Sequence, residues 1–373
     1  MRYLTAGESH GEALVTILEG IPSGLLIRED SINSELSRRM KGYGRGARMQ
    51  IEKDKAHILS GVRKGRTLGS PIALLIKNRD FKINSLTSIF KPRPGHADLA
   101  GALKFGDPDM RNILERASAR ETAVRVAAGA IAKSLLKEFR VDFMSHVVRI
   151  GGLEVEGSLP FRKACLAAER SPVRCIDKDT SYAMCRLIEN AKRQGDTLGG
   201  VFEIIIQGVV PGIGSFVQRD KRLGGKLAMS LMSIPGVKGV EIGAGFLLGE
   251  LHGSTAHDEI VYDRKKKRYL RKTNRAGGIE GGMSNGEDII LRAAMKPIAT
   301  LKKALLSVDV RTKKNVKAQV ERADVCVVPS AGVIGESVCA IAIAGAMTEK
   351  FGGDSLSEMK RNYEGYLKAV SRL

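Results

Sequence analysis

The 373-residue chain predicts an α+β fold, because strand-like and helix-like segments come in groups rather than in strict alternation. Residues 201–210 are rich in β-branched side chains and alternate loosely, which is typical of a strand, and residues 239–243 indicate a second, shorter strand. Residues 331–348 are almost entirely apolar and rich in small side chains, which indicates a central buried helix. No low-complexity linker divides the chain, so we expect one domain over residues 1–373.

The remaining helices are predicted from amphipathic spacing and from residues that favour helix ends. Asp30 and Ser31 are typical N-cap residues, and the amphipathic run after them predicts a helix that ends at Met40. Residues 112–139 carry one wide apolar face and predict a single long helix. Two further helices are expected over residues 223–234 and 354–373.

The composition excludes several classes of protein. The chain has 61 Lys and Arg against 41 Asp and Glu, a net charge of +20, so it should attract anions such as nucleic acid, an anionic membrane or phosphorylated metabolites. The absence of Trp argues against base stacking. Five cysteines without a Cys-x-x-Cys pair argue against a disulfide framework or zinc site and favour a reducing cytoplasm. We expect no metal.

Neither the beginning of the chain nor its longest apolar stretch predicts insertion into a membrane. Glu8 and His10 interrupt the beginning of the chain, so it is not expected to be a signal peptide. Pro329 and Glu336 interrupt the longest apolar stretch, residues 325–347, which therefore predicts a buried helix.

Two histidines lie on predicted glycine-containing loops and are candidate acid–base groups. His10 occurs in Gly-Glu-Ser-His-Gly, and His96 in Arg-Pro-Gly-His-Ala-Asp. Histidine titrates near neutral pH, which suits general acid catalysis. No serine or cysteine nucleophile signature accompanies either one. Each could instead be an ordinary histidine in a turn.

Glycine-rich and charged segments supply further candidates. Residues 38–48 contain four arginines, one lysine and three glycines, which is typical of an anion-binding loop and equally of a solvated basic loop or an RNA-binding patch. Arg116 and Arg120 are four residues apart and should share a helical face, either as a salt-bridged surface or toward a ligand. Residues 277–286 contain five glycines and predict a loop. Residues 264–275 carry eight basic side chains and predict a solvated hairpin.

Together these segments resemble the chorismate synthase family over nearly the whole chain. The motifs that carry the resemblance occur in the order GESHG, RRMKGYGRGARM, RPGHAD, ERASARETAVRVAAGAIAK, GDTLGGVFE, MSIPGVKGVEIGAGF, KTNRAGGIEGGMSNG, KPIAT and RADVCVVPSAGVIGE. The departures are few: Ala117 replaces a frequent serine, Ala299 replaces a proline or serine, and Pro235-Gly236 replaces Asn-Ala or Gln-Ala.

The resemblance implies a fold and a reaction. The family fold is a β-α-β sandwich, with helices layered between antiparallel sheets, in a homotetramer. The family converts 5-enolpyruvylshikimate 3-phosphate to chorismate by trans-1,4-elimination of phosphate, the last step of the shikimate pathway. The reaction needs fully reduced FMN (FMNH2), although it has no net redox change. The anionic substrate and FMN are consistent with the arginine-rich and glycine-rich sequence.

The resemblance also assigns roles to residues. His10 is expected on the phosphate side and His96 on the flavin side, and Asp324 is expected to handle the proton at flavin N5. The substrate-binding residues are expected to be Arg39, Arg45, Arg48 and Arg120, of which Arg39 and Arg45 are also candidate NADPH contacts. The expected FMN-binding residues are Arg116, Ala117, Ser118, Gly281, Lys296, Pro297, Ile298, Ala299, Thr300 and Arg322.

The expected partners follow from the same resemblance. We expect an external flavin reductase, with NADPH as a candidate reductant, because no reductase domain is present in the sequence. We expect a cytoplasmic homotetramer with no specific nucleic acid and no membrane. Two alternative functions are a nucleic-acid-binding protein, motivated by the charge of +20, and an NADPH-dependent flavin reductase that shares the FMN site.

Overall fold

Alternating apolar residues form a four-stranded antiparallel sheet in the first part of the chain. The computed structural model describes residues 1–46, 51–265, 267–321 and 324–372. Ile72, Leu74 and Ile76 are fully buried, so this period-two pattern directs one face of the sheet into the core. The strand order is β1 (Arg2–Ala6), β2 (Ala13–Glu19), β6 (Ile72–Lys77) and β3 (Ala56–Ile58).

A second antiparallel sheet has five strands. Phe202, Ile204 and Ile206 are fully buried on its inner face. The strand order is β10 (Val237–Ile242), β15 (Ile289–Met295), β9 (Gly200–Gln207), β7 (Asp142–Ile150) and β8 (Leu153–Glu154). The strands predicted over residues 201–210 and 239–243 are therefore confirmed as β9 and β10, with shifted ends.

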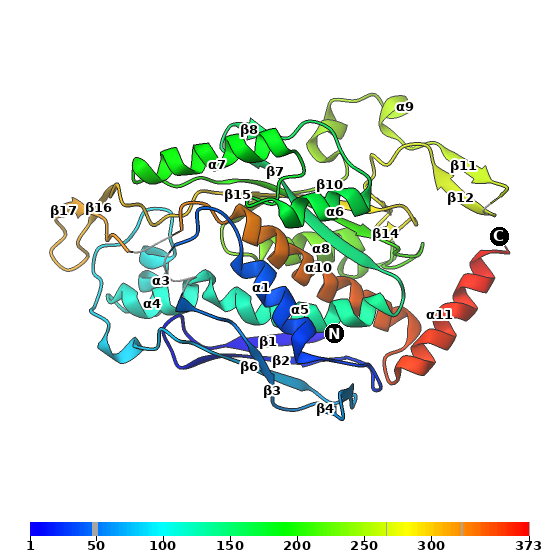
Figure 1. The fold of residues 1–373 in the computed structure, drawn as a ribbon, viewed down its shortest axis with the longest axis horizontal. Coiled ribbons are helices and arrows are strands. Elements are labelled where there is room, and N and C mark those ends of the chain that lie inside the picture. The colour runs from blue at the N-terminus through cyan, green and yellow to red at the C-terminus, as the bar shows by residue number, and fades with distance from the viewer. Residues whose placement is uncertain (47–50, 266, 322–323, 373) are drawn as a thin grey trace.

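Helices fill the space between the two sheets (Figure 1). Helix α5 (Thr122–Lys137) packs on β2 and β6, and α10 (Val328–Phe351) packs on β7 and β9. These two helices also pack against each other, with α1 (Glu29–Met40) and α8 (Leu223–Met232) in the same layer. This confirms the predicted α+β sandwich. Helix α10 is long and apolar enough to cross a membrane, but 83% of its most apolar window is buried inside the protein, as expected for a core helix.

Helices α5 and α10 cross closely because small residues meet at the contact. A Cβ atom placed on Gly129 of α5 would lie 2.6 Å from the Cα of Ser337 on α10. Real side chains do not approach a backbone so closely. The glycine therefore sets the distance between the two central helices.

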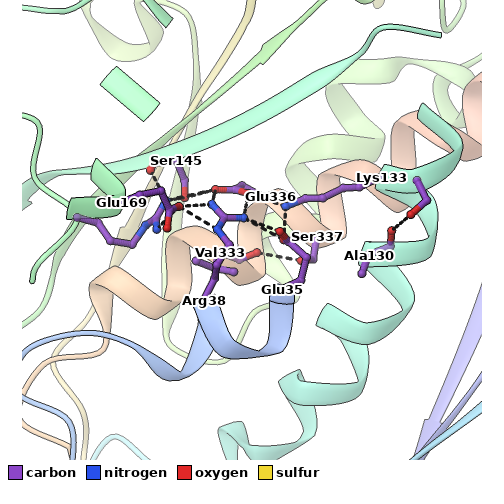
Figure 2. A network of polar contacts seen from close by, with 11 residues as sticks. Glu35, Arg38, Ala130, Lys133, Ser145, Glu169, Val333, Glu336 and Ser337 are labelled. Atoms are coloured by element: carbon purple, nitrogen blue, oxygen red, sulfur yellow. Dashed lines mark hydrogen bonds and ion pairs between the residues drawn. The ribbon is translucent and has the colours of Figure 1, made fainter. Parts of the chain in front are cut away.

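A buried carboxylate connects these helices to their neighbours (Figure 2). Glu336 of α10 lies 2.8 Å from Arg38 Nη1 of α1 and 2.6 Å from Lys133 Nζ of α5, and its other oxygen accepts a 2.6 Å hydrogen bond from Ser145 of β7. Burial alone would raise the pKa of Glu336. The charges of Arg38 and Lys133 together outweigh this effect and lower the pKa to well below its ordinary range. The carboxylate is therefore ionised and joins three helices and one strand.

The predicted helix over residues 112–139 was wrong, because the structure divides it. Helix α4 (Met110–Ala117) ends at Ser118, whose backbone is extended at φ −68° and ψ 141°. The Ser118 hydroxyl accepts a hydrogen bond from the Arg120 amide and begins a 3-10 turn, Ala119–Glu121, before α5. Arg116 and Arg120 consequently do not share a helical face. A serine that can cap a new turn outweighed the continuous apolar pattern.

Two further predictions needed correction. Helix α1 begins at Glu29 with no capping side chain, so Asp30 and Ser31 lie in its first turn and not at its N-cap. The segment 277–286 is not only a loop, since it contains the short hairpin β13 (Ile279–Glu280) and β14 (Met283–Ser284). The basic hairpin predicted over residues 264–275 is confirmed with shifted bounds, since its strands are β11 (Ile260–Asp263), which precedes the predicted range, and β12 (Arg268–Arg271).

The remaining elements lie around this framework. The predicted helix over residues 354–373 is confirmed as α11 (Leu356–Val370), which packs on α10. The other strands are β4 (Val62–Arg63), β5 (Arg66–Thr67), β16 (Leu306–Val308) and β17 (Asn315–Lys317). The other helices are α3 (Asp98–Phe105), α6 (Phe161–Arg170), α7 (Lys178–Arg193) and α9 (Gly253–Ala256). Short 3-10 turns cover Ile83–Ser85, Arg219–Lys221 and Gly245–Gly249.

Candidate active site

His10 lies in the loop between β1 and β2, and its ring faces two carboxylates. Its Nδ1 is 2.9 Å from Glu115 Oε1, and its backbone amide donates to Glu115 Oε2 at 2.7 Å. Its Nε2 is 3.6 Å from Asp80 Oδ2, and Asp80 also pairs with Lys82 at 2.7 Å. Only 15% of the His10 side chain is exposed, so the ring is oriented by the protein.

Asn78, directly after β6, holds this loop in place. Its Nδ2 donates to the carbonyl of Gly11 at 2.8 Å, and its Oδ1 accepts a 2.9 Å hydrogen bond from Arg120 Nε. A second contact joins the loop to the break between α4 and α5, because Ser9 Oγ donates to Ser118 Oγ at 3.1 Å. The predicted residues His10, Ser118 and Arg120 are therefore brought together.

Two predicted substrate arginines share one buried carboxylate. Arg120 Nη1 lies 2.6 Å from Asp54 Oδ1, and Arg39 Nη1 lies 3.4 Å from Asp54 Oδ2. Arg39 also donates to the Thr122 hydroxyl at 2.9 Å. Burial lowers the pKa of Arg39 to about 10, although the Asp54 charge opposes this. Asp54 thus compensates the positive charges of both arginines.

The Arg/Gly stretch after α1 lies against the segment that leads into α10. Arg45 Nε is 3.3 Å from Asp324 Oδ2, and the Gly46 amide donates to the same carboxylate. Gly44 has φ +88°, and a Cβ there would lie 2.8 Å from Ile188 Cγ2, so this close packing requires glycine. The predicted residues Arg48 and Arg322 lie outside the described residues.

Ser330 connects this loop to Arg39. The Ser330 hydroxyl contacts the Arg45 guanidinium and donates to the carbonyl of Arg39 at 2.8 Å. Arg45 and Asp324 also lie close enough to Arg39 to affect its pKa, which the Arg45 charge lowers and the Asp324 charge raises. The structure therefore places Arg39, Arg45, Arg120 and Asp324 in one region, as a shared site requires.

His96 belongs to a second cluster, formed by the loop before α3 and residues 296–300. His96 Nδ1 is 2.5 Å from Asp98 Oδ1, and Arg93 Nε is 2.8 Å from Asp98 Oδ2. Arg93 Nη1 also donates to the Thr300 hydroxyl at 2.8 Å, and Lys296 Nζ contacts the carbonyl of Gly95. Burial raises the pKa of Asp98, but hydrogen bonds from His96 and Arg93 lower it to well below its ordinary value.

An open cavity of about 660 Å³ lies beside His96. This volume is within the usual range for small-molecule sites, about 300–1,000 Å³. Apolar side chains form much of its wall, while Arg93 and His96 supply polar groups, as in many small-molecule sites. The lining residues are Pro92, Arg93, Pro94, Gly95, His96, Leu99, Ala100, Leu103, Leu306, Ser307, Val308 and Asn315. Within the described ranges, no group of three or more His, Cys, Asp and Glu side chains could hold a metal ion.

Residues 197 and 198 connect the His96 cluster to the segment around Asp324. The Thr197 hydroxyl donates to the carbonyl of Ile298 at 2.8 Å, and the Leu198 amide donates to Val325 at 2.9 Å, next to Asp324. In the part of the chain that the structure describes, no hydrogen bond or ion pair joins His10 directly to His96.

The other predicted cofactor residues are more scattered. Arg116 is exposed and donates to the carbonyls of Thr5 and Gly7 at 2.9 and 3.1 Å, so it supports the His10 loop from the side. Ala117 is the last residue of α4. Pro297 and Ala299 lie in the same 296–300 segment as Thr300. Gly281 lies in the exposed turn between β13 and β14, with φ +58°.

Sequence reasoning missed three polar residues that organise the site. Asp54 falls in a run of alternating charges, Glu-Lys-Asp-Lys, which is typical of a solvated surface. Asn78 has no motif around it, and Glu115 adjoins Arg116 in a segment whose pattern is also typical of a salt-bridged helix surface. For Asp54, the only signal in the sequence is that its charged run directly precedes the strand β3. Arg120, which both Asp54 and Asn78 contact, is distant from them in the sequence.

Loop histidines held by carboxylates, beside buried arginines, define an enzyme site for an anionic substrate. The comparisons agree with this class. A family model described as chorismate synthase matches residues 1–348. The chain therefore belongs to the chorismate synthase family, whose members are carbon–oxygen lyases of the shikimate pathway.

Relatives and a solved structure match over the full length. The chorismate synthase of Carboxydothermus hydrogenoformans is 52% identical over 383 residues, covering 99% of each chain. That of Moorella thermoacetica is 54% identical and covers 100% of each chain. A crystal structure of chorismate synthase has 43% identity and a TM-score of 0.83, and the match covers 100% of this chain and 98% of that one.

Proposed function

We propose that this enzyme catalyses the FMN-dependent trans-1,4-elimination of phosphate from 5-enolpyruvylshikimate 3-phosphate to give chorismate. The observation that carries the proposal is the pair of loop histidines, each bonded to a buried carboxylate and close to buried arginines. The elimination breaks one C–O bond to phosphate and one ring C–H bond, and it forms a new C=C bond. Phosphate leaves, so a cationic site with a proton donor favours the reaction.

The protein groups have separate roles in this proposal. His10 donates a proton toward the leaving phosphate. Arg39, Arg45, Arg48 and Arg120 make the local potential positive and so favour binding of the phosphate and carboxylate groups of the substrate. His96 and Asp324 hold protons on the side of the site where the cofactor binds.

The residues beside His96 fit reduced FMN. The cavity is large enough for the ring system, and the segment 296–300 adjoins it, because Arg93 donates to the Thr300 hydroxyl and Lys296 Nζ contacts the carbonyl of Gly95. When bound, reduced FMN would supply an electron transiently and take up the ring hydrogen at N5. The residues assigned to hold it are Lys296, Pro297, Ile298, Ala299 and Thr300 in the segment that adjoins the cavity, together with Arg116, Ala117, Ser118, Gly281 and Arg322 from other parts of the sequence.

The supply of reduced flavin and the assembly state are further parts of the proposal. An external flavin reductase would provide reduced FMN, with NADPH as its reductant or as a direct reductant at Arg39 and Arg45. The enzyme would act in the cytoplasm as a homotetramer.

The test is anaerobic phosphate release from 5-enolpyruvylshikimate 3-phosphate with dithionite-reduced FMN. Oxidised FMN and dithionite alone are the matched controls. We expect release only with reduced FMN. Equal release without reduced flavin, or no release from folded protein in any condition, would overturn the proposed reaction.

A further inference from the structure

We propose that Glu115 is a positioning residue that fixes the tautomer of His10, keeping a proton on Nδ1 and directing Nε2 toward the leaving phosphate. The assignment of Nε2 to the leaving phosphate rests on the proposed function, whereas the contact of Nδ1 with Glu115 does not. Glu115 lies near the end of α4 and its side chain is 3% exposed.

Both oxygens of the Glu115 carboxylate are used by the same residue. Oε2 accepts the His10 backbone N–H at 2.7 Å, and Oε1 is 2.9 Å from His10 Nδ1. An ionised carboxylate can only accept hydrogen bonds, so the second contact requires a proton on Nδ1. The Glu115 carbonyl also accepts the Ser9 amide at 2.9 Å, which fixes the backbone on the other side.

The charge state of Glu115 is consistent with this role. Burial raises its pKa, but hydrogen bonds from the His10 side chain and backbone, together with the charges of His10 and Arg111, lower it below the ordinary value. The group is therefore an acceptor at neutral pH.

The other ring nitrogen has a looser environment. His10 Nε2 is 3.6 Å from Asp80 Oδ2, which is beyond hydrogen-bond distance, and Lys82 offsets the Asp80 charge at 2.7 Å. In the imidazolium form, which carries a proton on each ring nitrogen, Nε2 is consequently the nitrogen that can donate its proton, and the donation leaves the Nδ1-protonated tautomer that Glu115 holds.

The substitution Glu115→Gln tests the tautomer directly. Glutamine is nearly isosteric, but it offers one acceptor and one donor where His10 presents two N–H groups. If its oxygen accepts the backbone N–H, its amide group faces Nδ1 and drives the proton to Nε2. Solid-state ¹⁵N NMR of the histidine-labelled full chain, without substrate or FMN, reports which ring nitrogen is protonated. Spectra would be taken at about pH 8.5, where an ordinary histidine is neutral.

We expect wild-type His10 to carry its proton on Nδ1 and the Glu115→Gln variant to carry it on Nε2. His10→Gln identifies the His10 signals. Asp98→Asn is the matched control, because it changes the same kind of contact at His96 and should leave the His10 signals in place. A wild-type proton on Nε2, or no change in Glu115→Gln, would overturn the inference.

Kinetics provides a second readout. Glu115→Gln should lower kcat by about 10²–10⁴-fold with little change in KM, as expected when a catalytic histidine takes the wrong tautomer. Glu115→Asp keeps the carboxylate and should recover a large part of the loss. Equal kcat values for the Gln and wild-type enzymes would count against the inference alone. If the tautomer shifts as expected but the wild-type enzyme releases no phosphate, the result would count against the proposed function alone.

Discussion

Buried carboxylates orient the cationic side chains and imidazoles of the candidate site. Asp54 contacts Arg39 and Arg120, while Asp98 contacts Arg93 and His96. Each carboxylate replaces water around two basic groups, which otherwise would be desolvated without compensation. The site therefore depends on acidic residues as much as on the arginines that are obvious in the sequence.

Removing Asp54 should destabilise the fold strongly. Asp54→Ala leaves Arg39 and Arg120 buried with less compensation, and breaking one partner of a buried ion pair costs about 3–5 kcal/mol. Urea unfolding of both proteins measures the difference. Glu349→Ala is the control, because Glu349 pairs with lysines at the surface and should cost less than about 1 kcal/mol. Equal losses for the two variants would contradict the prediction.

Asp98 should make stability depend on pH in the acid range. Its pKa is lower in the folded protein than in the unfolded chain, where it is about 3.9, so its stabilising contribution is present above that value. The contribution is lost as pH falls through the folded pKa. The unfolding free energy of wild type should therefore exceed that of Asp98→Asn most at pH 7, and the difference should shrink below about pH 4.

Urea unfolding of wild type and Asp98→Asn across this pH range measures the effect. A difference that grows on acidification would show that Asp98 is not held in its ionised form by His96 and Arg93.

The sequence identified the basic and imidazole residues but not most of their acidic partners. His10 and His96 stand out because glycine and proline surround them. Arg120 pairs with Asp54, which is 66 positions away in the sequence, and with Asn78, which is 42 positions away. Local patterns carry no information on such contacts, which arise only when the strands and helices pack.

At the scale of elements, the break between α4 and α5 brings separate motifs together. Ser118 ends one helix and begins the next turn, so Glu115 faces the His10 loop while Arg120 faces Asp54. A continuous helix would place residues four apart on one face. The sequence predicted the helical content here, but not the break, because the apolar spacing continues across Ser118.

Two helical glycines in different surroundings predict opposite effects of substitution by alanine. Gly129→Ala puts a methyl group against the Ser337 backbone and should cost about 1–3 kcal/mol through overpacking. Gly365→Ala in α11 meets no atom within 4 Å and should stabilise the protein by up to about 1 kcal/mol through helix propensity. Thermal or urea unfolding compares the two. A neutral Gly129→Ala would show that the helices can separate without loss.

At the scale of the whole molecule, the net charge of +20 should attract the phosphorylated substrate of the proposed reaction. Salt screens this attraction, with a Debye length of about 8 Å at physiological ionic strength. We expect kcat/KM to fall as NaCl is raised from low to physiological levels, while kcat changes little. Anaerobic steady-state kinetics with saturating reduced FMN measures both. A kcat/KM that is independent of salt would mean that the charge lies away from the substrate path.

The overall architecture was the most predictable property. Strand-rich and helix-rich groups of segments indicated α+β, and the motif order indicated the sandwich. The placement of the Arg/Gly loop against Asp324 was not predictable from spacing, because nearly 280 positions separate the two. It depends on α1 and α10 lying together in the middle layer.

The position of α10 has a consequence for synthesis on the ribosome. This helix, Val328–Phe351, fills the space between two sheets whose strands all precede it in the chain, as far as the structure describes them. The apolar faces of α5 and β9 therefore remain uncovered until α10 has been synthesised. Nascent chains with exposed apolar surface tend to aggregate or recruit chaperones. We therefore expect folding to be completed only after α10 has left the exit tunnel.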